Sequence, residues 1–213
     1  MRAILFILTL FISLPLLAQN KEVTKSEKQV YIIHGYDASI DKHWFKWLSQ
    51  ELEKQGIKAY RLAMPTPAQP QSEAWLEKMK KEVKINHETV IVAHSLGTIT
   101  TLNFLCESEK SVKGTILVSG FYEPISKEFA FLNPFVEKFA QRKNQPKVGN
   151  SVVITALDDG IVPQRFSDNL SQLLQSKFIR LPKGGHFLDR EGFTTFPLVL
   201  NEVLKIFNEH TND

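Results

Sequence analysis

The chain has 213 residues and a formal net charge of +3, from 26 Lys and Arg against 23 Asp and Glu. This length suits one domain with a single sizeable core, and the spread of basic residues without a stripe argues against a nucleic-acid partner. The single cysteine, Cys106, excludes an internal disulfide, so we expect stability to come from the apolar core. Cys106 itself is expected to be a buried apolar residue rather than a nucleophile.

Residues 1–18 are predicted to form a secretory signal peptide. Arg2 precedes an apolar run that ends at Ala18, and the chain turns polar at Gln19. The run is shorter than the ~20 residues of a membrane-spanning helix, which favours cleavage over an uncleaved anchor. We therefore expect residues 19–213 to form a single domain that is exported to the periplasm or the extracellular space. Membrane contact is expected only through an uncleaved signal segment.

Short runs rich in Val, Ile and Leu then alternate with longer segments of helical period, which is typical of an α/β domain with a parallel sheet. Helical faces are predicted around Trp44 and Leu48, around Trp75 and Met79, and over Phe196–Phe207. The predicted strands are Gln29–Ile33, Ile57–Leu62, Thr89–Ala93, Gly114–Ser119, Ser151–Ala156 and Lys177–Leu181. We expect a six-stranded, mostly parallel sheet with helices on both faces.

The interval 121–150 contains no predicted strand. Its large apolar residues, concentrated in Phe129–Phe139, predict one or two amphipathic helices. These helices either form a small cap over the sheet or pad the core beside it. In a cap, Phe131 and Phe135 are expected to contact the substrate.

The stretch Val90–Thr98 carries the strongest chemical signal. An apolar strand meets Ser95 between the small residues Ala93 and Gly97, and a helical pattern follows. This pattern is typical of a nucleophile elbow, although Ala93 stands where G-x-S-x-G has its first Gly, and the pattern alone is equally compatible with a tight turn. In an elbow the Ser hydroxyl is exposed at a sharp turn, and the amide of Leu96 at the helix N-terminus stabilises an acyl oxyanion.

A nucleophilic Ser needs a base, and the base needs an orienting acid. Candidates follow in the chain order Ser, Asp, His. Asp158 and Asp159 come after the fifth predicted strand, and His186 follows two glycines after the sixth. Each of these loops alone could be an ordinary turn, but loops at the carboxyl ends of parallel strands converge in space. The three elements together predict a catalytic triad.

The second oxyanion donor is expected in the loop after the first strand. Gly35 permits a sharp turn there, and the amide of Tyr36 is the candidate donor. His34 is expected to support this loop through hydrogen bonds.

His94 is expected to brace the elbow. The remaining histidines outside the candidate triad, His43, His87 and His210, lie in polar surroundings, and we expect them to be solvated. No H-E-x-x-H or paired Cys/His spacing occurs, so neither a metal nor another cofactor is expected.

Taken together, His34-Gly35, the elbow around Ser95, Asp159–Pro163 and Gly185–Phe187 resemble the α/β-hydrolase superfamily. The resemblance implies a three-layer α/β-hydrolase fold that lacks the first two strands of the superfamily. It also implies Ser95 as nucleophile, Asp159 as acid and His186 as base.

The small size of the chain points to a narrower group. The Trp44–Leu48 helix, the Met64-Pro65 step and Trp75 are similar to the compact serine hydrolases of the retinoblastoma-binding-protein-9/YdeN type. The resemblance covers nearly the whole mature chain. The signal peptide is a departure from the intracellular members of that group.

The sequence therefore predicts an exported serine hydrolase that cleaves a carboxylic ester, or else an amide or thioester, through an acyl-enzyme. Its expected partner is a small-molecule ester or acyl substrate. A serine peptidase acting on short peptides is one alternative. The other is a non-catalytic binding protein that keeps the hydrolase fold, and the Ser, Asp, His order argues against it.

Overall fold

The computed structural model describes residues 26–209, so the predicted signal peptide and His210 lie outside the described residues. Within this range the strands form a six-stranded sheet in the order β2-β1-β3-β4-β5-β6, and all neighbouring strands are parallel. The strands are β1 (Gln29–Ile33), β2 (Lys58–Leu62), β3 (Thr89–His94), β4 (Gly114–Val118), β5 (Asn150–Ala156) and β6 (Lys177–Leu181). The predicted sheet is confirmed, and no strand boundary differs from its prediction by more than one residue.

The apolar content of the strands explains their places in the sheet. Strands β1, β3 and β4 are buried along their whole length and lie inside the sheet, whereas β2 and β6 are partly exposed and form its edges. Strands buried on both faces need continuous runs of apolar residues, which β1 and β3 supply. Because all the strands are parallel, the loops that follow them meet at one edge of the sheet.

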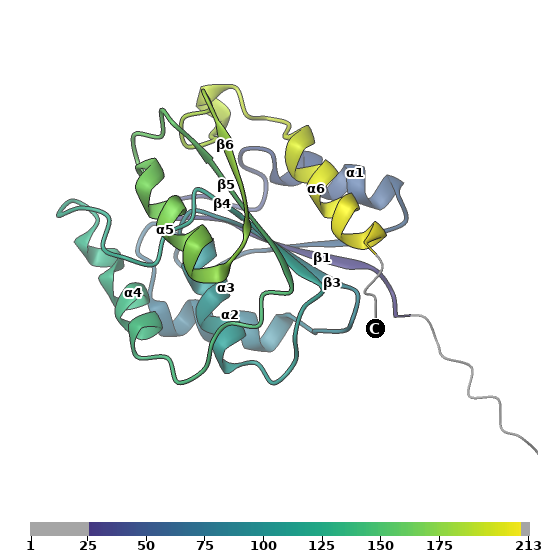
Figure 1. The fold of residues 1–213 in the computed structure, drawn as a ribbon, viewed down its shortest axis with the longest axis horizontal. Helices are drawn as coiled ribbons and strands as arrows, with labels where there is room; N and C mark the ends of the chain where they lie inside the picture. The colour runs from purple at the N-terminus through teal and green to yellow at the C-terminus, as the bar shows by residue number, and fades with distance from the viewer. Residues whose placement is uncertain (1–25, 210–213) are drawn as a thin grey trace, which may run out of the picture.

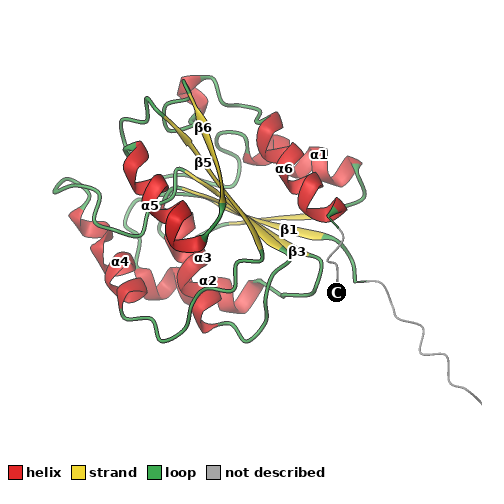
Figure 2. Ribbon diagram, viewed as in Figure 1, coloured by secondary structure: helices red, strands yellow, loops and turns green. Residues whose placement is uncertain are grey.

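Helices cover both faces of the sheet (Figures 1 and 2). Helices α2, α3, α4 and α5 lie on one face and α1 and α6 on the other, and each face has its own hydrophobic core cluster. The helices are α1 (Phe45–Lys54), α2 (Ser72–Glu82), α3 (Leu96–Glu107), α4 (Asn133–Ala140), α5 (Gln164–Leu174) and α6 (Pro197–Asn208), with 3-10 turns η1 (Ala130–Leu132) and η2 (Asp189–Glu191). Among residues 26–209, none of the helices has the length and hydrophobicity that a membrane crossing requires.

The interval 121–150 contains η1 and α4. The α4 side chains Phe135 and Phe139 are buried in the core cluster beneath them, and the Phe135 ring contacts Trp75 edge-on with centroids 5.8 Å apart. Phe131 is instead 45% exposed, with its ring 5.0 Å from that of Tyr36. Helix α4 therefore belongs to the helical layer on the sheet.

The contact between α3 and β1 depends on Gly97. A Cβ atom at this position would lie 2.5 Å from the carbonyl oxygen of Ile33 and 2.7 Å from that of His34. Both are backbone atoms and cannot yield without moving β1, so only glycine lets the first turn of α3 lie this close to the strand. At Gly160, by contrast, an added Cβ would meet no atom within 4 Å.

We expect Gly97→Ala to destabilise the protein by about 1–3 kcal/mol, because the added methyl group overpacks a rigid contact. Gly160→Ala is the matched control and should leave the melting temperature nearly unchanged. Thermal unfolding followed by circular dichroism measures both variants. Equal melting temperatures would show that α3 can move away from β1 at little cost.

Candidate active site

Ser95 forms the turn between β3 and α3 in a left-handed backbone conformation. Its φ is 52° and its ψ is −121°, values that a residue other than glycine adopts only where its surroundings hold it. The Ser95 N–H donates to the Val118 carbonyl at 2.9 Å. Thr98 donates to the Ser95 carbonyl from its N–H at 2.9 Å and from its hydroxyl at 2.6 Å. Strand β4 and the first turn of α3 thus fix this turn from both sides, as a nucleophile elbow requires.

Asp159 and His186, from the loops after β5 and β6, are in direct contact. His186 Nδ1 lies 2.9 Å from Asp159 Oδ2 and 3.1 Å from Oδ1. Since a carboxylate only accepts, a neutral His186 carries its proton on Nδ1 and keeps a lone pair on Nε2. Asp159 also accepts the Ser119 hydroxyl at 2.7 Å and the N–H groups of Ile161 and Val162 at 2.9 Å each. These donors fix the carboxylate that orients the ring.

The structure brings Ser95 and His186 to the same cavity but not into hydrogen-bond contact with each other. Such a bond between a nucleophile and its base is often long in the absence of substrate and tightens when substrate binds. The candidate nucleophile and the candidate base therefore line one cavity, and the candidate acid, Asp159, is already paired with His186 behind it.

Two carboxylates hold the backbone around His186. Asp158 accepts the N–H groups of Gly184 and Gly185 at 2.8 and 2.9 Å, and these bonds lower the pKa of Asp158. Glu191 accepts the N–H groups of His186 and Leu188, each at 2.9 Å. Gly185 has a φ of +53°, and a Cβ there would lie 2.5 Å from the Glu191 carboxylate, so this turn requires glycine.

His94 holds the same backbone from the side of the elbow. Its Nε2 lies 2.8 Å from the His186 carbonyl, so this nitrogen is the donor, and the two rings are 4.8 Å apart. Burial, together with the neighbouring histidines, puts the pKa of His94 well below its ordinary value. A neutral His94 adds no positive charge beside His186, which suits a base that must itself become cationic.

The candidate oxyanion donors lie on either side of Ser95. Leu96 opens α3, and its N–H is among the amides that an α-helix leaves unbonded in its first turn. A Cβ at Gly35 would lie 2.9 Å from Ser95 Cβ, so Gly35 lets the loop that carries Tyr36 lie against the elbow. His34 holds this loop, since its Nδ1 lies 2.8 Å from the Gly35 carbonyl and its Nε2 accepts the Met64 N–H at 3.0 Å.

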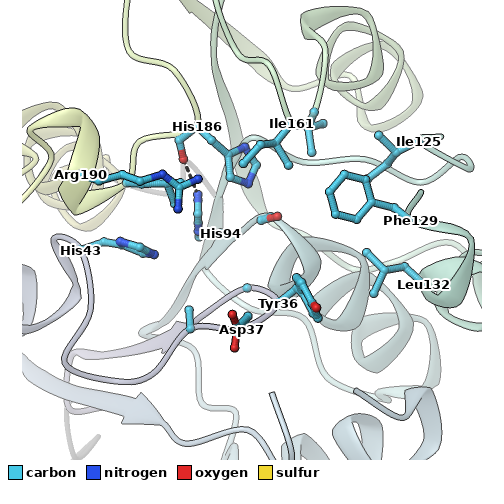
Figure 3. A pocket seen from close by; sticks show the side chains of 15 residues that line it. Tyr36, Asp37, His43, His94, Ile125, Phe129, Leu132, Ile161, His186 and Arg190 are labelled. Carbon is cyan, nitrogen blue, oxygen red and sulfur yellow. Dashed lines mark hydrogen bonds between the residues drawn. The ribbon is translucent and has the colours of Figure 1, made fainter. Parts of the chain in front are cut away.

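The cavity at the edge of the sheet has a volume of about 200 Å³. This is below the range of roughly 300–1,000 Å³ typical of pockets for drug-sized ligands, which favours a small substrate. Figure 3 shows an apolar wall at one end, with Ile125, Phe129 and Leu132. Phe131 and Phe135, which a cap was expected to use for substrate contact, do not line the cavity, because Phe135 is buried against Trp75 and Phe131 packs beside Tyr36.

The sequence-based expectation for His43 is wrong. Its side chain is only 10% exposed and lies beside the cavity, with its ring 5.8 Å from that of His94. Its Nδ1 accepts the Asp189 N–H at 3.0 Å, and burial lowers its pKa although Asp189 opposes the shift. A polar local sequence gave no sign of this contact, which joins residues 146 positions apart.

Three further residues of the site were not predicted from the sequence. Ser119 supports Asp159, Glu191 supports the His186 backbone, and Arg190 lines the cavity. Ser119 could have been found, because it directly follows β4 and must lie at the same edge of the sheet as the other loops. Glu191 and Arg190 had no comparable signal. Among the described residues, no group of three or more His, Cys, Asp or Glu side chains could hold a metal ion.

Comparison with known proteins gives concordant results. Residues 30–205 match the model of the family described as serine hydrolase. YdeN of Bacillus subtilis (strain 168) is 40% identical over 188 residues, which cover 86% of this chain and 98% of that protein. The serine hydrolase RBBP9 of Rattus norvegicus is 23% identical over 150 residues, covering 70% of this chain and 80% of that protein.

Solved structures agree with these relatives. The crystal structure of the B. subtilis ydeN gene product has a TM-score of 0.78 at 36% identity, and covers 85% of this chain and 100% of that one. Mouse alpha/beta hydrolase domain-containing protein 10 has a TM-score of 0.66 at 12% identity, over 84% of this chain and 89% of that one. At this low identity the second match shows the fold alone. The α/β-hydrolase fold expected from the sequence is confirmed.

The two adjacent aspartates can be separated by mutation. Asp159→Asn should lower kcat about 10⁴-fold, because an amide NH₂ facing Nδ1 leaves His186 in the wrong tautomer. Asp158→Asn keeps an oxygen acceptor for the Gly184 and Gly185 N–H groups and should cost far less. Turnover of p-nitrophenyl butyrate by both variants, with circular dichroism as a check of folding, tests this. A larger loss for Asp158→Asn would assign the acid to Asp158.

Proposed function

The chain belongs to the serine hydrolase family, and from this premise we propose that it cleaves a small carboxylic ester through an acyl-enzyme formed on Ser95. The family makes it a hydrolase rather than a non-catalytic binding protein with the same fold. The single observation that carries the proposal is the buried Asp159–His186 pair, whose His186 lines the same cavity as a Ser in elbow conformation.

In the proposed reaction, His186 Nε2 removes the proton from the Ser95 hydroxyl as Oγ attacks the substrate carbonyl. The amides of Leu96 and Tyr36 donate to the resulting oxyanion. His186 then returns the proton to the leaving alcohol. In the second half of the cycle it activates the water that hydrolyses the acyl-enzyme, while Asp159 stabilises the imidazolium in both halves.

An ester is the proposed substrate class because of the form of the cavity. It is small, and its apolar wall of Ile125, Phe129 and Leu132 offers contacts for an acyl chain. A peptide would instead place polar N–H and C=O groups against this apolar wall, where they would find no partner. Amides and thioesters remain chemically accessible to the same groups, and a substrate panel ranks the three classes.

We also propose that the enzyme works outside the cytoplasm. The proposal rests on the sequence of residues 1–18, in which a basic residue precedes an apolar run of signal-peptide length. A protein without disulfides can be stable on either side of the membrane, so the lack of disulfides does not bear on localisation. The sequence of residues 1–18 alone supports this proposal.

Ser95→Ala should reduce kcat for p-nitrophenyl butyrate by about 10⁴- to 10⁶-fold, since the members of a triad act as a unit. The variant should also lose labelling by a fluorophosphonate probe, which reacts quickly only with an activated Ser. Ser108→Ala, at a half-buried site outside the cavity, is the control and should keep both properties. Activity of Ser95→Ala above a tenth of wild type would contradict the proposal.

The apolar wall leads to a separate prediction about acyl length. Phe129→Ala should lower the kcat/KM for hexanoyl relative to acetyl esters several-fold, because each lost methylene contact is worth ~1 kcal/mol. Phe135→Ala, in the core below, should lower the melting temperature and leave that ratio unchanged. If the two variants gave the same ratio, the acyl chain would lie elsewhere.

A further inference from the structure

The end of the cavity opposite the apolar wall has a different character. Figure 3 shows Arg190 and His43 on the far side of His186 and His94 from Ile125, Phe129 and Leu132. An ester with apolar groups on both sides of its scissile bond would therefore leave the polar end of the cavity without a complementary partner.

Arg190 has a charge that no carboxylate of the described residues neutralises. Arg61 and Arg180 form ion pairs of 2.6 Å with Asp41 and Asp168, whereas no acidic oxygen lies within ion-pair distance of the Arg190 guanidinium. The neighbouring carboxylate of Asp189 accepts the backbone N–H of Arg190 at 2.8 Å and faces His43 at 3.4 Å.

Arg190 is positioned by the same contacts as the base. It lies in η2, where Glu191 binds the N–H groups of both His186 and Leu188. The carboxylate of Glu191, the residue after Arg190, thus ties this segment back to His186, so the backbone of Arg190 keeps a fixed place relative to His186. Because Arg190 and His186 belong to the same loop, the Arg190 guanidinium is well placed to contact a substrate that His186 acts on.

His43 supplies a second donor at this end. Its Nδ1 accepts the Asp189 N–H, so a neutral ring carries its proton on Nε2. Burial lowers the pKa of His43, which favours this neutral form. Asp37 also lines the cavity, but Figure 3 shows it beside Tyr36, on the other side of His94 from Arg190.

We infer that this enzyme prefers esters whose alcohol portion carries a carboxylate, which Arg190 and His43 bind while the acyl chain lies against the apolar wall. The alcohol is assigned to this end because His186, the group that protonates the leaving oxygen, lies on the same loop as Arg190. A guanidinium offers a carboxylate two parallel N–H donors, and the His43 N–H adds a third. The inference rests on the proposed esterase function.

The test compares 3-carboxyphenyl butyrate with 3-carbamoylphenyl butyrate, which differ only by an anionic or a neutral group of similar size. The measured quantity is the ratio of their kcat/KM values. Arg190→Gln should lower this ratio about tenfold, as expected for loss of a charge-assisted hydrogen bond at a partly solvated site. Arg190→Lys should retain part of the preference, and in wild type the ratio should fall as ionic strength rises.

Arg165→Gln is the matched control, since Arg165 is an exposed arginine on α5 that stacks on Phe166 and does not line the cavity. It removes the same charge and should leave the ratio unchanged. An unchanged ratio in Arg190→Gln, or an equal fall in Arg165→Gln, would overturn the inference while leaving the esterase function intact. Failure of the wild-type enzyme to cleave either ester or to react with the fluorophosphonate probe would overturn both.

Discussion

The left-handed backbone of Ser95 is the constraint on which the site depends. Such a conformation costs on the order of 1–3 kcal/mol, and it persists because β3 and α3 are buried on either side of it. Gly97 allows α3 to lie against β1, and Gly35 allows the loop after β1 to lie against Ser95. The same close contacts that hold the strained backbone also place the loop that carries Tyr36, the second candidate oxyanion donor, beside the candidate nucleophile.

His186, the proposed base, is held by contacts from strand β3, from the loop after β5 and from η2. Asp158 binds the turn before His186, Glu191 binds its N–H, and His94 binds its carbonyl. None of these residues touches the His186 ring by a hydrogen bond, which is left to Asp159. The backbone and the ring are therefore fixed by separate groups. Burial also keeps His94 neutral, so the electrostatic cost of forming the His186 imidazolium is not increased by its nearest ring neighbour.

The strands and the elbow could be predicted because their signals are local. Continuous apolar runs mark the buried strands, and the small residues around Ser95 mark a crossing of strand and helix. The parallel sheet then requires the loops after β5 and β6 to meet the elbow, so Asp159 and His186 also followed from chain order. Ser119 also follows a parallel strand and lies at the same edge of the sheet. It was not predicted, because a Ser after a strand is common and does not by itself indicate a contact with Asp159.

The sequence by itself thus determined the sheet, the elbow and the loops that supply the candidate acid and base. Only the tertiary structure decided which side chains of the loops face the cavity. His43, expected in solvent, lies beside it, and Phe129 lines it where Phe131 does not. No local sequence pattern distinguishes Arg190 from the other exposed arginines. The physical reason is that a loop side chain is oriented by contacts with distant segments, such as that of Asp189 with His43, and no local periodicity encodes them.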